Sequence, residues 1–313
     1  MKNKTKVTLS TVTIAISTLL MLKANAEEYP VKQVSEGIYY HQGVQEDANR
    51  DNKGEIANTG FIIGEKCIAV VDTGGSYLEG KSLLEVIRDK SDLPICYVIN
   101  THAHPDHFLG NAAFKETEAT FIGNDKMPAA IEARKSFYET RFSDILGPHF
   151  KGTEFIEPTQ LVSVDNPITI DLGERELVLT SYPTSHTDND LTVLDKKTKT
   201  LWTGDLLFVK RIPALDGSIN GWLSTIEALK SMKLNTVIPG HGPAQHDEWQ
   251  QAFDDEAHYF STIREQIRAI IYDMGTINEA TESVGLSEKG KWLLFDDYHK
   301  RNITAAFTEL EWE

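Results

Sequence analysis

Cysteine and long apolar runs are both scarce in this chain of 313 residues. It has only two cysteines, Cys67 and Cys96, and neither lies in a suitable sequence register with the histidine-rich segment described below to be expected as a metal ligand. After the first 26 residues, no stretch approaches the roughly 20 apolar residues that a membrane span requires. Internal repeats and low-complexity tracts are absent as well. With 40% hydrophobic and 25% charged residues, the composition is that of an ordinary globular protein.

The first 26 residues have the pattern of a secretory signal peptide. Lysines at positions 2, 4 and 6 precede an apolar stretch over residues 7–22, and the sequence Ala-Asn-Ala at 24–26 matches a small-x-small cleavage site. An uncleaved membrane anchor is the alternative, although the apolar stretch is short for a permanent span. We therefore expect export to the periplasm and a mature chain that begins at residue 27, with no stable membrane span.

Positive charge is in short supply, because 31 Lys and Arg residues face 47 Asp and Glu residues. Residues 1–26 hold four of those lysines and no acidic residue, so cleavage leaves 27 basic and 47 acidic side chains, a net charge of −20. Such a surface repels phosphate backbones, which argues against nucleic acid as a partner. A small molecule is the expected substrate.

The two cysteines occupy equivalent places in two predicted strands. Cys67 lies five residues before Asp72, where one strand ends, and Cys96 lies five residues before Thr101, just after another. If these strands are parallel neighbours that end level, the two sulfur atoms also lie level. In an oxidising compartment this placement predicts a disulfide, and two separate buried thiols are the alternative.

The most informative segment is residues 101–111, with the sequence THAHPDHFLGN. It holds His102, His104, Asp106 and His107. The preceding run, residues 95–100, is short, apolar and β-branched, so the segment follows the C-terminal end of a predicted buried strand, where α/β proteins place their sites. Imidazole and carboxylate are the ligands that zinc takes where thiolate is absent. The segment therefore predicts a metal site rather than a polar loop with unrelated histidines.

Short strands and helices alternate along the rest of the chain. Strands are expected over 60–64, 67–72, 121–123, 190–194, 200–203 and 236–238, and helices over 78–90, 126–146 and 220–232. Because strands mixed with helices occur twice in a similar order, we expect an α/β fold over residues 27–246, with two sheets face to face and helices outside. A helical extension follows over 247–313. Its isoleucines at helical spacing predict a face that packs against the sheets, with a partner-binding face as the alternative.

Three later loops each add one potential ligand at the end of a predicted strand. His186 lies in Ser-His-Thr-Asp just before a strand, Asp205 follows Trp-Thr-Gly, and His241 lies within Pro-Gly-His-Gly. Glycine beside a ligand permits the tight turn and close backbone approach that a metal site needs. Each loop alone is a weak signal, but in this order, after the histidine segment, they indicate one metal centre.

With these motifs the chain resembles the metallo-β-lactamase superfamily over about residues 30–245. The resemblance implies an αββα sandwich with the site at one edge between the sheets. It implies one zinc ion held by His102, His104 and His186, a second held by Asp106, His107 and His241, and Asp205 as a bridge between them. Two such ions would lower the pKa of a shared water for attack on a carbonyl, with Asp106 as the catalytic residue that orients the hydroxide or relays a proton.

One departure from the family pattern bears on the substrate. The best-known lactamases of the superfamily carry a cysteine where Asp205 stands, and a bridging aspartate is more similar to glyoxalase II, lactonases and other general hydrolases. The run His-Thr-Asp-Asn at 186–189 resembles the HTxDN motif of lactamases with its fourth position shifted. These features favour an ester, thioester, lactone or amide as substrate, with β-lactamase activity as an alternative.

Further segments resemble the quinoprotein relay system zinc metallohydrolases, exported proteins related to a sulfur-oxidation accessory family. They are residues 184–190, 204–208, 211–218, 295–304 and 309–313. This resemblance implies a quinoprotein alcohol dehydrogenase or its cytochrome as a partner. It also leaves two alternatives to hydrolysis. One is a persulfide dioxygenase with a single iron on His102, His186 and Asp205, and the other is a non-catalytic, metal-containing accessory protein.

Charged residues beside the ligands are expected to support the site. Asp72 is predicted to hydrogen-bond the ligand loops, since Ser76 is the better cap for the helix at 78–90. Asp188 either orients His186 or forms a turn. Lys210 and Arg211 follow the bridging aspartate and either bind a substrate carboxylate or remain solvated surface cations.

Overall fold

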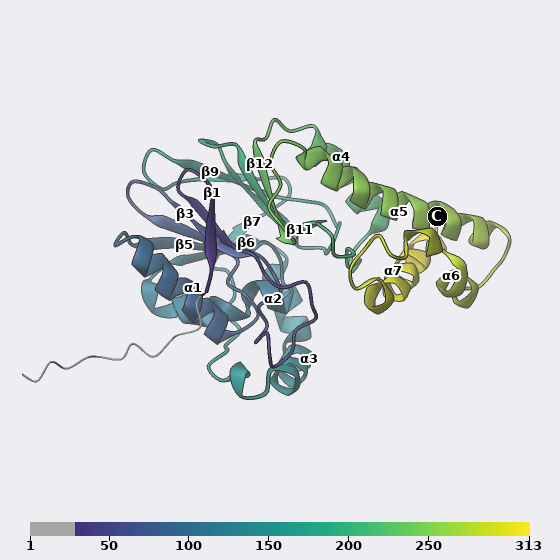
Figure 1. The fold of residues 1–313 in the computed structure, drawn as a ribbon, viewed down its shortest axis with the longest axis horizontal. Coiled ribbons are helices and arrows are strands. Elements are labelled where there is room, and N and C mark those ends of the chain that lie inside the picture. The colour runs from purple at the N-terminus through teal and green to yellow at the C-terminus, as the bar shows by residue number, and fades with distance from the viewer. Residues whose placement is uncertain (1–28) are drawn as a thin grey trace, which may run out of the picture.

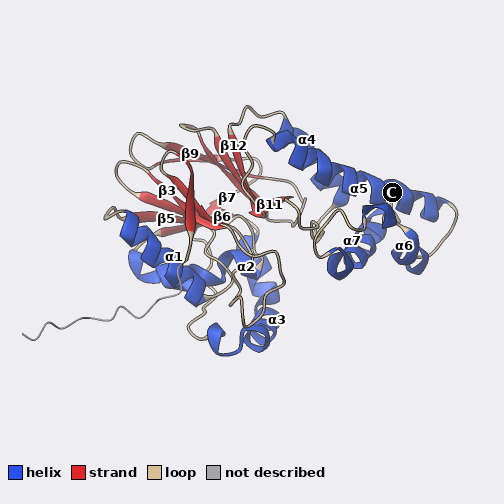
Figure 2. Ribbon diagram, viewed as in Figure 1, coloured by secondary structure: helices blue, strands red, loops and turns tan. Residues whose placement is uncertain are grey.

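The structure, a computed structural model, describes residues 29–313, so the predicted signal peptide lies outside the described residues. Two β-sheets face each other, helices cover their outer sides, and a helical extension projects from one side (Figure 1). Colouring by secondary structure separates these layers clearly (Figure 2). This is the predicted αββα sandwich followed by a C-terminal helical region. Among the helices of residues 29–313, none combines the length and apolar character of a membrane span.

The first sheet has seven strands in the order β1-β2-β3-β4-β5-β6-β7. They span Val31–Ser35, Ile38–His41, Thr59–Ile63, Ile68–Val71, Ile95–Ile99, Thr120–Asn124 and Gln160–Val162. Strands β1 to β4 are antiparallel, and β4 to β7 run parallel to their neighbours. Because parallel strands end at the same edge, the loops after β4 and β5 meet there.

The second sheet has five strands in the order β12-β11-β10-β9-β8. They span Thr236–His241, Thr200–Phe208, Leu191–Asp195, Glu176–Ser181 and Ile168–Asp171. Only the outer pair, β11 and β12, is parallel, and the other neighbours are antiparallel. The parallel pair ends at the edge that carries Asp205 and His241.

Alternate side chains along the strands face the two sides of each sheet and so form the apolar layers. On β3 and β4, Ile62 and Val71 face the second sheet, where they pack with residues such as Leu179 and Trp202. Their sequence neighbours Phe61 and Val70 face outward, against helix α1 (Tyr77–Lys90) and the 3₁₀ helix Leu109–Thr117. Side chains of a strand point alternately to its two faces, so one apolar run serves both layers.

The remaining helices cover the outer faces and form the extension. They are α2 (Pro105–Phe108), α3 (Met127–Leu146), α4 (Ile219–Lys230), α5 (Trp249–Tyr272), α6 (Ile277–Ser283) and α7 (Phe295–Leu310). The C-terminal part of α5 reaches past the sheets with α6 and α7 beside it (Figure 1). Ile263 and Ile267 are fully buried in an apolar cluster that runs from β11 and α4 to α7. The predicted isoleucine face therefore lies in a core that the extension shares with the sandwich.

Cys67 and Cys96 lie at the paired parallel strands β4 and β5, and the structure joins them by a disulfide with their Cα atoms 5.8 Å apart. The bond lies at the opposite end of these strands from the histidine segment, since Cys67 precedes β4. It links neighbouring strands of the first sheet and has no part in the site.

Candidate metal centre

The histidine segment is fixed between β5 and α2 by its own flanking residues. Pro105 opens α2, where its fixed φ suits the first helical position. Asn100 and Asn111, at the two ends of the segment, hydrogen-bond each other through both amide groups at 2.8 and 3.1 Å. Asn100 also donates to the carbonyl of His107 at 3.2 Å. These contacts close the loop, so its ligand side chains are held on a rigid turn.

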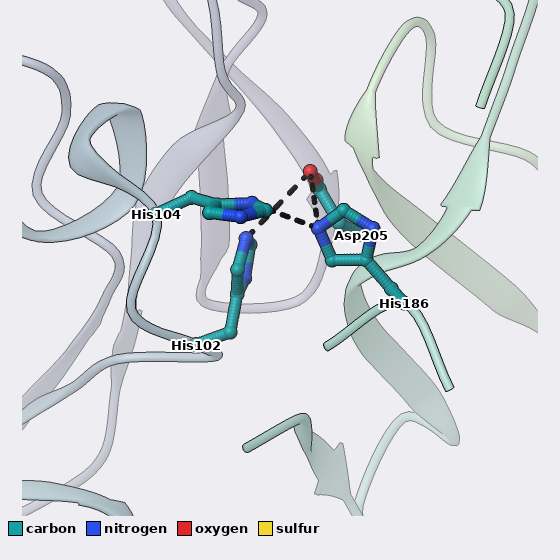
Figure 3. A group of neighbouring side chains, drawn as sticks. All are labelled: His102, His104, His186 and Asp205. Atoms are coloured by element: carbon teal, nitrogen blue, oxygen red, sulfur yellow. Dashed lines mark hydrogen bonds and ion pairs between the residues drawn. The ribbon is translucent and has the colours of Figure 1, made fainter. Parts of the chain in front are cut away.

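Four side chains form what we call the first group: His102, His104, His186 and Asp205 (Figure 3). One potential ligand atom from each lies within 4.8 Å of the others. His104 Nδ1 is 2.9 Å from His186 Nε2, and Asp205 Oδ2 is 3.4 Å from the same Nε2. The three imidazoles come from two separate loops and the carboxylate from strand β11, and all four side chains point toward one another (Figure 3).

Asp106, His107 and His241 form the second group, whose ligand atoms also lie within 4.8 Å of one another. His241 Nε2 is 3.3 Å from Asp106 Oδ2. Asp205 faces both groups, because its Oδ1 is 3.2 Å from His107 Nε2 and its Oδ2 is 3.4 Å from His241 Nε2. The structure thus brings together all seven residues that the sequence predicted as ligands, with Asp205 between the two groups.

Each of the five imidazoles uses its outer nitrogen to contact an oxygen atom. The pairs are His102 Nδ1 with Thr101 Oγ1 (3.1 Å), His104 Nε2 with Asp216 Oδ2 (3.1 Å), His107 Nδ1 with Asp72 Oδ2 (2.8 Å), His186 Nδ1 with the Ala214 carbonyl (2.7 Å) and His241 Nδ1 with the Ile56 carbonyl (2.8 Å). An imidazole that donates its outer proton in this way presents a lone pair at its inner nitrogen. All five inner nitrogens face the two groups.

Three of the side-chain atoms that face the two groups are buried without a hydrogen-bond partner. His102 Nε2, His107 Nε2 and Asp205 Oδ1 are buried without a hydrogen bond. Buried polar atoms normally have hydrogen-bond partners. His104 Nδ1 and His186 Nε2 lie 2.9 Å apart, and when both imidazoles carry their proton on the outer nitrogen, the lone pairs of these two inner nitrogens repel each other. A cation at each group would satisfy these atoms, and five imidazoles with two carboxylates suit zinc. The residues present therefore fit a pair of divalent metal ions.

Electrostatics favour the ligand forms of His186, His102 and Asp205, but not that of His107. Burial lowers the pKa of His186 to about 3 and that of His102 well below its usual range, so both imidazoles are neutral. Burial opposes ionisation of Asp205, but His241 and His107 outweigh it and hold its pKa well below normal. Burial likewise opposes charge on His107, whose pKa is nevertheless raised by Asp205 and Asp72. A metal ion would therefore displace a proton at His107.

Asp72 supports two of the imidazoles. Its Oδ1 accepts from the Thr101 backbone, while its Oδ2 accepts from the Thr101 hydroxyl and from His107 Nδ1, each at 2.8 Å. The Thr101 hydroxyl in turn contacts His102. The backbone of Asp72 has φ of +53°, an uncommon conformation for a residue other than glycine. Ser76, and not Asp72, caps α1 by accepting from the Glu79 backbone at 3.2 Å.

Replacement of Asp72 by asparagine is expected to weaken metal binding. An amide at this position lacks the charge and can turn an N–H toward His107 Nδ1–H, where two donors would oppose each other. Loss of such an orienting partner typically costs about 10–100-fold in metal affinity. Competition for zinc with a chromophoric chelator measures this change in Asp72→Asn, and the exposed Asp89→Asn is the matched control. Equal affinities in the two variants would contradict the role assigned to Asp72.

Three predicted supporting residues have other partners. Asp188 is exposed and accepts from Asn189 Nδ2 at 2.8 Å, so the prediction that it orients His186 is wrong and the Ala214 carbonyl has that role. Lys210 is exposed and lines a separate hollow with His258 and Trp292.

Unlike the exposed Lys210, Arg211 is neither the solvated nor the substrate-binding cation that the sequence suggested. It is 3% exposed, donates to the hydroxyl of Tyr298 at 2.9 Å and to the carbonyl of Glu46 at 3.2 Å, and lies 3.4 Å from His241 Nδ1. Burial and the Arg211 charge both act to lower the pKa of His241, but Asp205 and Asp106 outweigh them and raise it above its ordinary value. These partners occupy two of its three nitrogens within the protein, so it stabilises the wall of the site.

Sequence reasoning missed the two partners that come from residues 209–218. A backbone carbonyl such as that of Ala214 carries no sequence signal. Asp216 lies in the segment 211–218 that carried a family resemblance, but nothing in that segment indicated that its side chain contacts His104 and lies 3.1 Å from Arg134 of α3. Burial opposes ionisation of Asp216, but the contacts with His104 and Arg134 lower its pKa to about 2.

A family model described as the metallo-beta-lactamase superfamily matches residues 52–241. The chain belongs to the metallo-β-lactamase superfamily. Metallo-beta-lactamase IND-1 of Chryseobacterium indologenes is 25% identical over an alignment of 202 positions, and the match covers 62% of this chain and 73% of that protein. Metallo-beta-lactamase type 2 of Bacillus sp. (strain 170) is 24% identical over 231 residues, or 71% of this chain and 80% of that protein.

Solved structures of the superfamily share the fold. A metallo-beta-lactamase from Pontibacter korlensis superposes with a TM-score of 0.59 at 17% identity, and TMB-1 with 0.57 at 19% identity. Each comparison covers 74% of this chain and 98% of the other. Members of this superfamily are in general hydrolytic metalloenzymes, and the two groups of His and Asp residues are the candidate metal ligands here.

Proposed function

We propose that this protein is a dinuclear zinc hydrolase that cleaves a carbonyl substrate, namely an ester, thioester, lactone or amide. The observation that carries the proposal is the convergence of five imidazoles and two carboxylates in two adjoining groups that share Asp205. His102, His104 and His186 would hold one ion, and Asp106, His107 and His241 the other. Paired zinc ions supply Lewis acidity and make hydroxide available near neutral pH.

The chain's own residues supply what remains. Asp106 keeps 15% of its side chain exposed, whereas His107 and His241 of the same group are 0 and 2% exposed. Its carboxylate can therefore meet a substrate or water that enters from solvent, and it can hold a proton at Oδ2. The outer-nitrogen contacts keep the five imidazoles from turning, so they stay aimed at the two ions.

A single iron centre of the persulfide dioxygenase type is the main alternative for this scaffold. It would need His102, His186 and Asp205 alone. The second group argues against it, because the ligand atoms of Asp106, His107 and His241 would then converge without an ion to share, although His107 and His241 are almost fully buried. We therefore favour two ions over one.

Metal analysis of the purified protein tests the proposal directly. We expect two zinc ions per chain by elemental analysis, hydrolysis of a generic ester or lactone, and loss of that activity on treatment with a chelator, with recovery on adding zinc. Because two relatives are named metallo-beta-lactamases, a β-lactam belongs in the substrate panel. One iron per chain, or hydrolysis that survives complete metal removal, would overturn the proposal.

We further propose that the enzyme is exported and acts beside a quinoprotein alcohol dehydrogenase or its cytochrome. The pattern of residues 1–26 and the resemblance of the C-terminal segments support this. The alternative is an accessory role without catalysis. A deletion strain that loses alcohol oxidation distinguishes the two, because restoration by a variant with its metal ligands replaced would show that hydrolysis is not needed.

A further inference from the structure

Residues 209–218, the loop between β11 and α4, supply outer partners for two imidazoles of the first group. The Ala214 carbonyl accepts from His186 Nδ1 at 2.7 Å, and Asp216 Oδ2 accepts from His104 Nε2 at 3.1 Å. Two of the three outer contacts of this group therefore come from this one loop, and the third, to His102, comes from Thr101. The position of this loop therefore determines how His186 and His104 are oriented.

Helix α7 and the turn before it hold this loop in place. The Leu293 backbone pairs with the loop on both sides of Arg211, at 2.8 Å to the Lys210 carbonyl and at 3.1 Å from the Ile212 N–H. The hydroxyl of Tyr298 accepts from Arg211 at 2.9 Å. These contacts join positions more than eighty residues apart in the chain.

Asn302 of α7 brackets Ala214. Its Nδ2 donates to the Pro213 carbonyl at 2.7 Å, and its Oδ1 accepts from the Leu215 N–H at 2.9 Å. Because both neighbours are tied to one rigid amide, the peptide that carries the Ala214 carbonyl has little freedom to rotate away from His186. Asn302 is 1% exposed and its Nδ2 also contacts the hydroxyl of Tyr259 at 3.0 Å, so the amide is itself fixed.

Glu309, two turns further along α7, holds the other end of the loop. Its carboxylate accepts from the Ser218 hydroxyl at 2.9 Å and from the Ile219 N–H at 2.7 Å. These are the N-cap and first residue of α4, and a carboxylate is favourable at a helix N-terminus. The contact fixes the N-cap Ser218, two residues after Asp216, the partner of His104.

We propose that α7 is the positioning element of the first metal-ligand group, with Asn302 and Glu309 as positioning residues that act through residues 209–218. The inference rests on the proposed function in one respect, namely that the first group binds an ion. The C-terminal extension contributes none of the seven candidate ligands, but through residues 209–218 it affects the affinity of one of the two ions. The second group receives its outer contacts from Asp72 and Ile56. Its link to α7 runs through Arg211, which contacts Tyr298 and lies 3.4 Å from His241 Nδ1, and not through Asn302 or Glu309.

Asn302→Ala in the full chain tests this inference, with Asn278→Ala as the control, since Asn278 is an exposed residue of α6. Zinc affinity is measured for both ions by competition with a chromophoric chelator. We expect one of the two ions to bind at least about 10-fold more weakly in Asn302→Ala, as for other orienting partners, while the second changes little. Glu309→Gln keeps an acceptor for the Ile219 N–H but loses the charge, so we expect a smaller weakening of the same ion.

A second measurement separates positioning from general destabilisation. In uniformly ¹⁵N-labelled apoprotein, the Nδ1–H resonance of His186 should be protected by the Ala214 carbonyl in the wild type and exchange faster in Asn302→Ala. Unchanged affinity for both ions, or equal weakening of both, would overturn the inference while leaving the proposed function intact. A wild-type protein that binds fewer than two ions would overturn both. If Asn302→Ala does not fold, Glu309→Gln provides the same comparison.

Discussion

Replacing Asp106 with asparagine is expected to lower kcat by about 10²–10⁴, the usual contribution of a positioned acid–base group. The isosteric amide keeps an oxygen atom near His241 Nε2, which is 3.3 Å from Asp106 Oδ2, but it can neither carry the charge nor accept a proton. Burial opposes ionisation of the native carboxyl, and His107 and His241 nevertheless hold its pKa below normal, so it is a carboxylate at neutral pH. The measurement is kcat for a generic ester or lactone with zinc in excess.

Excess zinc is necessary because Asp106 is also an expected ligand of the second ion. Elemental analysis under assay conditions establishes that both ions are bound, so any loss of kcat then belongs to the chemical role of the carboxylate. Asp165→Asn, an exposed residue in the turn between β7 and β8, is the matched control. Full activity of Asp106→Asn at full zinc occupancy would contradict the assigned role.

The ligand set was predictable from sequence for a physical reason. The histidine segment follows the parallel strand β5, and Asp205 and His241 lie near the ends of the parallel pair β11 and β12, so these ligands meet at one edge. His186 lies between the antiparallel strands β9 and β10. Hydrophobic patterning located those strands, so the convergence of the loops followed from the fold class. The prediction of β11 was too short, since this strand runs to Phe208 with register shifts on either side of Gly204.

The outer partners of the ligands were predictable only in part. Asp72 follows a strand beside the histidine segment, and this position was enough to predict that it hydrogen-bonds the ligand loops. Ala214 contributes a carbonyl, which any residue has, so nothing in the sequence marks it. The burial of Arg211 depends on Tyr298, which lies 87 residues away in the extension. Contacts between residues so far apart in the sequence depend on where α7 packs against the sandwich, and the hydrophobic periodicity of one helix does not predict its packing position.

Asp205→Asn is expected to have the other largest effect, because this carboxylate faces both groups. The amide keeps one neutral oxygen and loses the negative charge that His107 and His241 stabilise. We expect the affinity of one of the two ions to fall by more than about 100-fold, beyond the range for an outer partner. Hydrolysis should be lost with it, since the reaction needs both ions. Elemental analysis after dialysis against a weak chelator measures the stoichiometry.

The number of ions that Asp205→Asn retains separates the two schemes for this scaffold. With two zinc ions, the first group still offers His102, His104 and His186, and three imidazoles are a complete protein ligand set for one zinc. The variant should then bind one ion, because the Ala214 carbonyl and Asp216 still orient His186 and His104. With a single iron on His102, His186 and Asp205, the same change removes a third of the ligands and the only ion should be lost. Retention of two ions would show that Asp205 bridges nothing, which contradicts the shared position that its 3.2 and 3.4 Å contacts with His107 and His186 indicate.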